Sequence, residues 1–282
     1  MNIRRVGIIA NMGKQNAVKE SVKLGAWLLE RGISVVYEEE LAPKVAGLES
    51  ATSERMGGMV DMIVAFGGDG TLLKTARAVQ GHDVPIMGVN LGSFGFMTVV
   101  NLHEIYDAME LALKGDCRTS KRMMLDASVN GGHLSALNDV VINRGNLSRM
   151  VNLETFVDEK YLTTFKADGL IISTPTGSTA YSLSAGGPIV FPEMDAVIIT
   201  PICPHTLSNR PIVIPPESAI KIVLYTREEG ATVTADGQDS ILMKSGDTVT
   251  IVKAEHGVRL FDSSERDYME VLRGKLGWGG LP

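Results

Sequence analysis

A short apolar run that ends abruptly in glycines constrains the fold of this 282-residue chain more than any other feature. Met62–Phe66 has the composition of a buried strand, and Gly67-Gly-Asp-Gly-Thr71 follows it at once. Leu72, Ala76 and Val79 then recur at helical spacing. In open α/β sheets, ligands bind beyond the carboxyl ends of the strands, where such strand-to-helix turns lie. The run therefore predicts both a fold class and a ligand site.

The rest of the first 115 residues repeats this alternation. Further strands are predicted at Val6–Ala10, Ser34–Tyr37 and Pro85–Val89, and helices at Val18–Leu29 and Ile105–Ala112. Strands separated by helical crossovers form parallel sheets with helices on both faces. We therefore expect residues 1–115 to form an α/β domain with a doubly wound parallel sheet.

Beyond Gly115 the pattern changes to short segments with a period of two. Asn130-Gly-Gly132 has the composition of a hairpin turn, and short strands are predicted at Leu125–Val129, Ile220–Leu224, Ala231–Ala235 and Asp247–Val252. We expect residues 116–262 to form a β-rich domain. Residues 263–282 are expected to form a helix over Ser264–Leu272, with Asp262 or Ser264 as N-cap, and a tail; the helix could pack on the first domain.

Composition and charge exclude several classes of partner. The chain is 44% hydrophobic and 21% charged, the balance of an ordinary globular protein. Its net charge of −6 argues against a broad surface for nucleic acid or anionic membrane, although one local basic pocket is compatible with it. Cys117 and Cys203 belong to no Cys-x-x-Cys pair and are expected to be buried thiols. With no signal peptide or long apolar span in the sequence, we predict a cytoplasmic protein.

The glycine loop predicts a polyphosphate site. Gly67, Gly68 and Gly70 allow the backbone to turn sharply and to approach a phosphate closely. Amides at the start of the following helix donate hydrogen bonds to an anion placed there. Thr71 completes the loop, and Lys74 could add a positive charge.

Asp69 is the unexpected member of that loop, because a carboxylate repels phosphate. Two tasks suit it: general base for an attacking hydroxyl, or partner of a divalent cation. The alternative is that Gly-Asp-Gly only makes a turn. The loop lacks the Gly-Lys-Ser/Thr ending of a Walker A motif.

A second glycine motif follows the predicted strand Pro85–Val89. Asn90–Phe96 again places flexible backbone at the carboxyl end of a strand. Asn90 could make one fixed hydrogen bond in a nucleotide pocket. The alternative is a tight turn anchored by Phe94 and Phe96 in the core.

Two segments of the β-rich half indicate a nucleoside. Asn138 and Asp139 are adjacent and could hold two ribose hydroxyls or an adenine edge, although such a pair is more often a turn or cap. Lys166–Pro188 gathers hydroxyl side chains, glycines and Tyr181. We expect that a core segment could not satisfy so many polar groups. A neutral polar pocket with an aromatic face suits a nucleoside.

These motifs resemble those of a known family. The Gly-Gly-Asp-Gly loop is similar to that of NAD kinases, diacylglycerol kinases, sphingosine kinases and phosphofructokinases, and Lys166–Pro188 closely resembles the NAD-binding segment of NAD kinases. The resemblance implies transfer of the terminal phosphate of ATP, or of polyphosphate, to the 2′-hydroxyl of the adenosine ribose of NAD. It also implies a divalent cation (Mg²⁺) and a homodimer or homotetramer.

The resemblance also implies roles for single residues. It makes Asp69 the catalytic base and places Asn90 in the nucleotide loop. Asp139 stands where the family has glutamate, one methylene longer. Gln238 lies in Asp236-Gly-Gln238, which a β-hairpin turn alone would explain equally well. The implied contacts to NAD are Asp69, Gly70, Asn138, Asp139, Arg149, Lys166, Asp168, Thr179, Ala180, Tyr181, Ser184 and Gln238.

Two other functions fit parts of the sequence. A lipid kinase would need an exposed apolar or basic membrane-facing surface, which the composition does not indicate. A non-catalytic sensor would bind NAD without turnover, and the retention of Asp69 with its whole loop speaks against it. The sequence leaves open the metal ligands, the choice between NAD and NADH or between ATP and polyphosphate, and feedback by NADP or NADPH.

Overall fold

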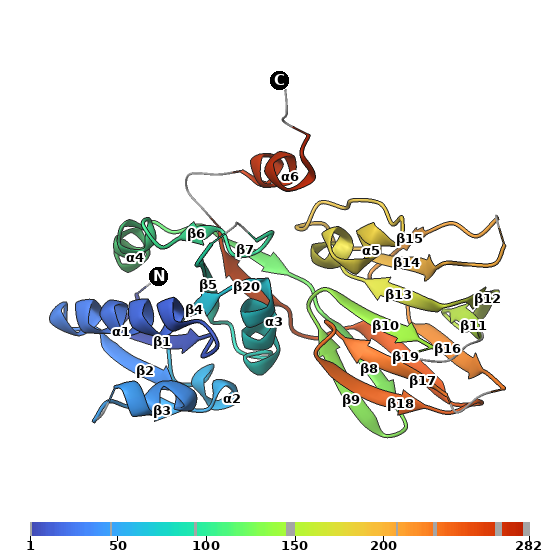
Figure 1. Ribbon diagram of the computed structural model, residues 1–282, viewed down its shortest axis with the longest axis horizontal. Coiled ribbons are helices and arrows are strands. Elements are labelled where there is room, and N and C mark those ends of the chain that lie inside the picture. Colours follow the sequence, from blue (N-terminus) through green and yellow to red (C-terminus); the bar gives the residue numbers. More distant parts are fainter. Residues whose placement is uncertain are drawn as a thin grey trace. The chain divides into compact units, whose positions relative to one another are not determined.

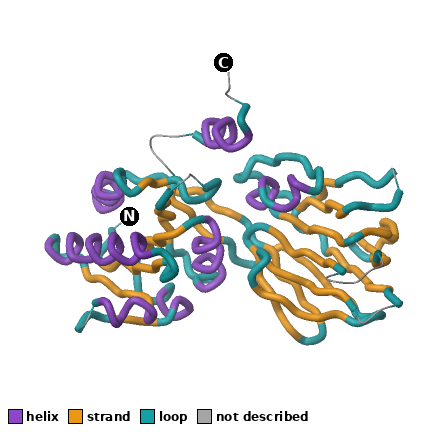
Figure 2. Tube along the Cα trace, viewed as in Figure 1, coloured by secondary structure: helices purple, strands orange, loops and turns teal. Residues whose placement is uncertain are grey.

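The structure, a computed structural model, describes residues 2–45, 47–92, 95–144, 150–206, 208–227, 230–262 and 267–278. It divides into two compact units: Met1–Lys121 with Val258–Pro282 (unit 1), and Arg122–Gly257 (unit 2). Figure 2 shows that most helices belong to unit 1 and that strands dominate unit 2. The chain therefore returns to unit 1 at Val258, whereas the sequence placed residues up to 262 in the second domain.

The described strands of unit 1 form one sheet in the order β3-β2-β1-β4-β5-β20-β7, with β6 beside β5. The pairs that join β3 through β20 are parallel, which confirms the predicted parallel sheet. Figure 1 shows β20, coloured red, among the blue and green strands of this sheet. The strands are β1 Arg5–Ala10, β2 Ser34–Glu38, β3 Ser50–Ala51, β4 Met62–Gly67, β5 Pro85–Asn90, β6 Val100–Asn101, β7 Thr119–Arg122 and β20 Val258–Phe261.

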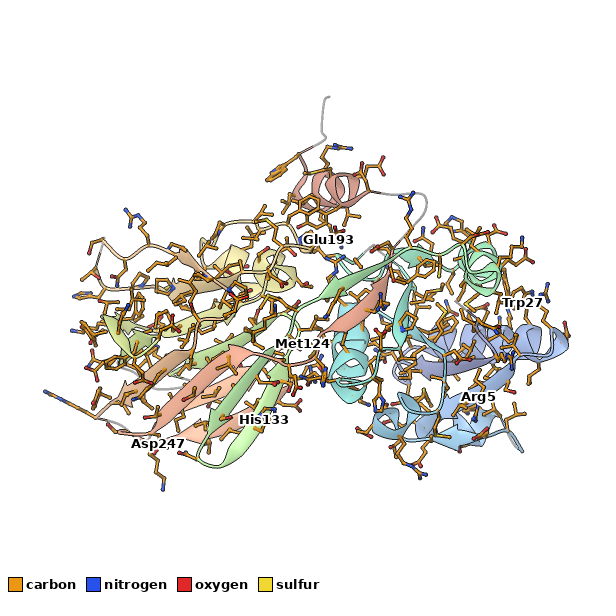
Figure 3. The ribbon with its side chains drawn as sticks, turned by 180° about the vertical axis from the view of Figure 1, so that it is seen from behind. Arg5, Trp27, Met124, His133, Glu193 and Asp247 are labelled. Carbon is orange, nitrogen blue, oxygen red and sulfur yellow. The ribbon has the colours of Figure 1, made fainter. Side chains whose placement is uncertain are left out.

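Helices cover both faces of this sheet. They are α1 Gln15–Glu30, the 3₁₀ helix η1 Glu39–Lys44, α2 Ser53–Met56, α3 Asp69–Ala78 and α4 Ile105–Lys114. Helix α6, Tyr268–Leu276, also belongs to unit 1. Val6 of β1 is buried in one cluster with residues of α1 and α4, whereas the next residue, Gly7, faces Met56 of α2. Trp27, labelled on α1 in Figure 3, lies 5.5 Å from the ring of Tyr106 on α4. The doubly wound arrangement is therefore confirmed.

Unit 2 consists of two antiparallel sheets, in the orders β15-β14-β13-β10-β17-β18 and β12-β11-β16-β19-β8-β9. Leu153, Phe165 and Ile222 of one sheet share a buried cluster with Ile142 and Leu170 of the other, so the two sheets pack face to face. The elements are β8 Leu125–Val129, β9 Gly132–Ala136, β10 Asp139–Asn143, β11 Val151–Val157, β12 Lys160–Ala167, β13 Gly169–Ser173, η2 Thr176–Thr179, α5 Tyr181–Ser184, β14 Val197–Ile202, β15 Ile212–Ile214, β16 Ile220–Tyr225, β17 Ala231–Ala235, β18 Asp239–Met243 and β19 Thr248–Lys253.

The predicted hairpin turn is confirmed. Val129 pairs with Gly132, and the two residues between them, Asn130 and Gly131, have φ angles of 51° and 76°. Two consecutive positive φ angles define the turn whose twist matches that of antiparallel strands, and Asn-Gly favours it.

The predicted start of the C-terminal helix is wrong. The helix begins at Tyr268, and its N-cap is Asp267, whose side chain accepts a 2.8 Å hydrogen bond from the Glu270 amide. The Glu270 carboxylate accepts in return from the Asp267 amide at 3.2 Å. This reciprocal box satisfies two backbone donors at once and so fixes the start. Asp262 instead accepts from the Ser120 hydroxyl at 2.7 Å, and Ser264 lies outside the described residues.

The expectation of buried thiols is wrong for one cysteine. Cys203 is exposed and Cys117 is half-buried. Cys203 directly follows β14, at a φ of 46°. No helix in the described part of the chain is long and apolar enough to cross a membrane.

Candidate active site

The first two glycines of the turn from β4 into α3 differ in what they allow. A Cβ at Gly67 would overlap the Thr71 hydroxyl, which folds back over the turn. A Cβ at Gly68, the N-cap of α3, would meet no atom within 4 Å, so its backbone borders open space. Gly68 also has no side chain to cap the helix, which leaves the positive end of α3 accessible to an anion.

A cavity of about 690 Å³ lies at this turn. Its lining comes from the loops that follow β1, β4 and β5, at the carboxyl ends of three adjacent strands, and from α6. Such a place is where ligands bind in open α/β sheets. The lining residues are Lys14, Gln15, Asn16, Gly68, Asp69, Asn90, Leu91, Gly92, Gly95, Thr98 and Lys275.

The structure thus brings the two glycine motifs together, which sequence reasoning had treated separately. In the parallel pair of β4 and β5, Gly67 lies opposite Asn90, so the two loops leave the sheet at the same level. Asn90 is 6% exposed, and its Oδ1 accepts a hydrogen bond from the Gly92 amide at 2.9 Å. Phe94, one expected anchor of this turn, lies outside the described residues.

Asp69 does more than make a turn, because its carboxylate is held by the second loop. Oδ1 accepts from the amides of Met97 (3.3 Å) and Thr98 (3.1 Å) and from the Thr98 hydroxyl (3.0 Å). Oδ2 accepts from the Phe96 amide at 2.9 Å. A Cβ at Gly95 would overlap both Asp69 Oδ1 and the Thr98 hydroxyl. The carboxylate is therefore fixed at the cavity by neutral donors.

Lys74 is placed away from the cavity. Its Nζ lies 3.6 Å from carboxylate oxygens of both Glu38 and Glu40. Glu38 is itself buried and accepts from the Ser53 hydroxyl at 2.5 Å. Lys74 lies five residues beyond Asp69 on α3, about 140° around the helix, so its side chain leaves on another face.

Lys14 brings positive charge to the cavity instead. It is the N-cap of α1, it is exposed, and it forms no ion pair with any described residue. Sequence analysis assigned it no role, because a single lysine before a helix carries no signal of its own. Gly67, Gly70 and Thr71 belong to the loop but are not among the described residues that line the cavity.

In unit 2, the expectation that a core segment could not satisfy the hydroxyls of residues 173–182 is wrong. Four of these side chains are fully buried and hydrogen-bonded within the protein, mostly to carbonyls of neighbouring turns. The bonds join Ser173 Oγ to the Thr174 carbonyl (2.9 Å), Thr174 Oγ1 to the Leu137 carbonyl (2.6 Å), Ser178 Oγ to the Pro175 carbonyl (2.7 Å) and Ser182 Oγ to Thr200 Oγ1 (3.0 Å).

The residues predicted to contact NAD lie on the accessible side of the same segment. Thr179 and Ala180 are half-buried, and Tyr181 and Ser184 are exposed. A Cβ at Gly177 would overlap the Asn138 backbone, so η2 packs directly against the Asn138–Asp139 pair. The segment therefore has a buried supporting half, which adjoins that pair, and an accessible half.

Two buried oxygens near this contact have no hydrogen-bond partner among the described atoms: Asn138 Oδ1 and Thr176 Oγ1. Buried polar atoms are rarely left unpaired, because the loss of water is not compensated. A ligand hydroxyl or amide would supply the missing partner. Sequence reasoning missed Thr176, which differs in no obvious way from the buried hydroxyls beside it.

Asp139 is unusual in its protonation. It is 5% exposed. Burial and, to a lesser degree, the charge of Asp236 raise the pKa of Asp139 to about 7. Near neutral pH its carboxyl is therefore divided between the form that donates and the form that only accepts. The Asp236 carboxylate itself is held by the amides of Leu137 (3.1 Å), Asn138 (2.7 Å) and Asp139 (3.2 Å).

The other residues predicted to contact NAD lie in a turn, in an ion pair or on an exposed strand. Asp236 and Gly237 form the turn between β17 and β18, so the hairpin is observed, and Gln238 is exposed in it. Asp168 forms a 2.9 Å ion pair with Arg144, which sequence analysis did not single out. Lys166 is exposed on β12. Arg149 lies outside the described residues.

A glycine loop and a fixed carboxylate line a cavity at the parallel sheet of unit 1, and unit 2 holds buried oxygens without a partner among the described atoms. These features suit an enzyme of two units that binds a phosphate-bearing ligand. Family models give the particular family. The model of the ATP-NAD kinase N-terminal domain matches residues 6–117, and that of the ATP-NAD kinase C-terminal domain matches residues 137–263.

Curated relatives agree with these models. A protein of Syntrophotalea carbinolica named NAD kinase is 48% identical over 283 residues, which cover 98% of this chain and 99% of the relative. One of Geotalea daltonii with the same name is 49% identical over 282 residues, with the same coverage. This chain belongs to the NAD kinase family.

Solved structures show the same fold. A yeast NADH kinase complexed with NADH has a TM-score of 0.90 and 25% identity, covering all of this chain and 90% of that one. An NAD kinase from Archaeoglobus fulgidus in complex with ATP has a TM-score of 0.80 and 26% identity, covering 98% of this chain and 100% of that one.

The raised pKa of Asp139 predicts a pH dependence of stability. The unfolded chain releases this proton near pH 4, whereas the folded chain holds it up to about pH 7. The stability contribution is full below pH 4 and is lost as pH rises to about 7. Relative to Asp139→Asn, the wild-type free energy of unfolding should fall by up to about 4 kcal/mol over this range. Urea unfolding of both proteins from pH 4.5 to 7.5 measures it, and parallel pH curves would contradict the prediction.

Proposed function

We propose that this NAD kinase uses Asp69 as the general base for phosphoryl transfer from ATP to the 2′-hydroxyl of the adenosine ribose of NAD. Asp69 accepts the hydroxyl proton while the ribose oxygen forms a bond to the terminal phosphorus. The bond from that phosphorus to the bridging oxygen breaks, and ADP leaves with the electron pair. The observation that carries this proposal is the fixed Asp69 carboxylate at the cavity beside Gly68.

The cavity of unit 1 is the proposed donor site. Phosphoryl transfer depends mainly on positioning and on electrostatic stabilisation of the phosphates. Gly68 and Gly92 offer close backbone approach, and Lys14 offers a charge that no described carboxylate neutralises. These groups would bind phosphates rather than the adenine ring of ATP. Polyphosphate is therefore a second candidate phosphate donor beside ATP.

The cavity offers few protein ligands for the divalent cation expected for this family. The described residues contain no group of three or more His, Cys, Asp or Glu side chains that could hold a metal, and Asp69 is the acidic residue of the lining. Mg²⁺ commonly takes one or two carboxylates together with phosphate oxygens and water. The described lining offers no second carboxylate, so the ion would be held mainly by phosphate oxygens and water, and it would neutralise phosphate charge.

Unit 2 carries the proposed NAD contacts. Asn138 Oδ1 and Thr176 Oγ1 are unpaired acceptors for ligand hydroxyls, and the half-protonated Asp139 could donate as well as accept. Tyr181 is 46% exposed and offers a ring face for a base or nicotinamide. Arg149, Lys166, Asp168, Thr179, Ala180, Ser184 and Gln238 complete the proposed contacts of unit 2, and Asp69 and Gly70 are the proposed contacts of unit 1.

We also propose assembly into a homodimer or homotetramer in the cytoplasm. Unit 2 exposes several large apolar side chains, with Leu242 at 76%, Tyr161 at 59% and Met194 at 56%. Large apolar side chains exposed to this degree are candidates for an interface between copies of the chain. Light scattering coupled to size-exclusion chromatography would measure the state, and a monomer at micromolar concentration would contradict this proposal.

Asp69→Asn should reduce kcat by roughly 10²–10⁴-fold, because the amide cannot accept the hydroxyl proton. The purified protein is incubated with NAD, ATP and Mg²⁺, and NADP is assayed with an NADP-specific dehydrogenase. Calorimetric titration with NAD serves as control for the binding site. Near-normal turnover of the variant would exclude the base. No turnover by the wild type, with NAD still bound, would favour a non-catalytic sensor.

Lys14→Met should raise KM for ATP by about tenfold, because one charge-assisted contact to phosphate is lost. KM for NAD should stay within about twofold, since the change lies at the donor site. Lys19→Met is the matched control: Lys19 is an exposed lysine of the same helix and does not line the cavity. Equal effects of the two variants would show that general charge, rather than Lys14, matters.

Tyr181→Ala should raise KM for NAD by about five- to tenfold with little change in KM for ATP, because a packing surface for the dinucleotide is removed. Tyr225→Ala is the matched control, since Tyr225 has the same 46% exposure, also in unit 2, but bonds to Glu154. The Michaelis constants of both variants are compared in the NADP assay. An unchanged KM for NAD would remove Tyr181 from the proposed site.

A further inference from the structure

Among the described residues, one short loop supplies all four hydrogen bonds to the Asp69 side chain. Its residues are Gly95, Phe96, Met97 and Thr98, here called the clamp loop. We propose that Thr98 is a positioning residue of the kinase: by occupying Oδ1 of Asp69, it leaves Oδ2 as the oxygen that accepts the substrate proton. This inference rests on the proposed role of Asp69 as base.

The two carboxylate oxygens of Asp69 accept different numbers of hydrogen bonds. Each carboxylate oxygen has about two lone-pair directions. Oδ1 accepts three hydrogen bonds, from the Met97 amide and from both the amide and the hydroxyl of Thr98. Within the described part of the chain, Oδ2 accepts only from the Phe96 amide, at 2.9 Å. The capacity for one further hydrogen bond, to a ribose hydroxyl, is therefore on Oδ2.

The Thr98 hydroxyl is directed at Oδ1 by its packing. Thr98 is 1% exposed, so water does not compete for its hydroxyl. A Cβ built on Gly88 of β5 would lie 3.1 Å from the Thr98 methyl carbon, Cγ2, so this methyl is seated closely over the strand. A β-branched side chain has few χ1 alternatives, and with the methyl fixed the hydroxyl is fixed too. Thr98 thus links β5 to the catalytic carboxylate.

Gly95 makes the approach of the clamp loop to Asp69 possible. Any Cβ at this position would overlap Asp69 Oδ1 and the Thr98 hydroxyl. A side chain at Gly95 would therefore displace the carboxylate or the hydroxyl from this arrangement. Substitutions at Gly95 and at Thr98 would therefore disturb the same hydrogen bond, between the Thr98 hydroxyl and Asp69 Oδ1, in two independent ways.

The test replaces the hydroxyl by a methyl of nearly the same shape. Thr98→Val should lower kcat by about 10- to 100-fold, because misplacement of a catalytic group by less than an ångström has effects of this size. KM for ATP and for NAD should stay within about twofold, since only the transition state is affected. Thr98→Ser retains the hydroxyl and should stay within about threefold of wild-type kcat. Gly95→Ala should lower kcat in the same way as Thr98→Val.

Thr75→Val is the matched control. Thr75 is also 1% exposed and lies on α3, but its hydroxyl donates to the Thr71 carbonyl at 2.9 Å and does not contact Asp69. Its substitution should leave kcat unchanged, with Tm measured for every variant.

Each other outcome overturns the inference. If Thr98→Val turns over normally while Asp69→Asn is inactive, the proposal for Asp69 stands and the positioning role of Thr98 is excluded. If Thr98→Ser falls as far as Thr98→Val, or if KM rises without loss of kcat, the loop matters for folding or binding rather than through its hydroxyl. If Asp69→Asn is itself active, the proposed function of Asp69 fails first, which is a distinguishable result. Gly95→Ala keeps the test available should Thr98→Val not fold.

Discussion

The parallel register of β4 and β5 is the constraint on which the rest of the site depends. Gly67 lies opposite Asn90, so both strands end at the same level and both glycine loops begin there. A slip of the register would move one loop along the strand direction by about 3.3 Å per residue. The hydrogen bonds between Asp69 and Thr98, 3.0 and 3.1 Å long, could not survive such a slip. The buried strands thus set the position of the carboxylate.

Local pattern was sufficient to predict the elements of unit 1 and the loop that carries Asp69. Met62–Phe66 and Pro85–Val89 are apolar runs ended by glycine or asparagine, and those signals depend only on neighbouring residues. The hairpin at Asn130–Gly131 was predictable for the same reason. The joining of Val258–Phe261 to the sheet of unit 1 was not, because its partner Pro85–Asn90 lies more than 160 residues earlier.

The direction of side chains was the second feature that could not be predicted from the sequence. Lys74 lies near the loop in sequence, yet it pairs with Glu38 and Glu40 on the far side of α3. Thr174 and Ser178 are residue types that also line ligand pockets, yet their buried hydroxyls donate hydrogen bonds to carbonyls of the protein. Composition counts polar groups but does not say which carbonyls lie within reach, and only the fold supplies that information.

The chemistry of the donors around Asp69 suits the role of general base that we propose for it. A lysine or arginine would also hold the carboxylate, but it would form an ion pair and compete with the substrate hydroxyl for the lone pairs of Asp69. Neutral amides and one hydroxyl fix the carboxylate without bringing a second charge to it. Lys74, the nearest lysine along the helix, is drawn away by two glutamates. Lys14 enters the cavity from another helix, where it can address phosphate without forming an ion pair with a described carboxylate. The arrangement separates the two charges that the proposed reaction uses, a carboxylate for the proton and a cation for the phosphates.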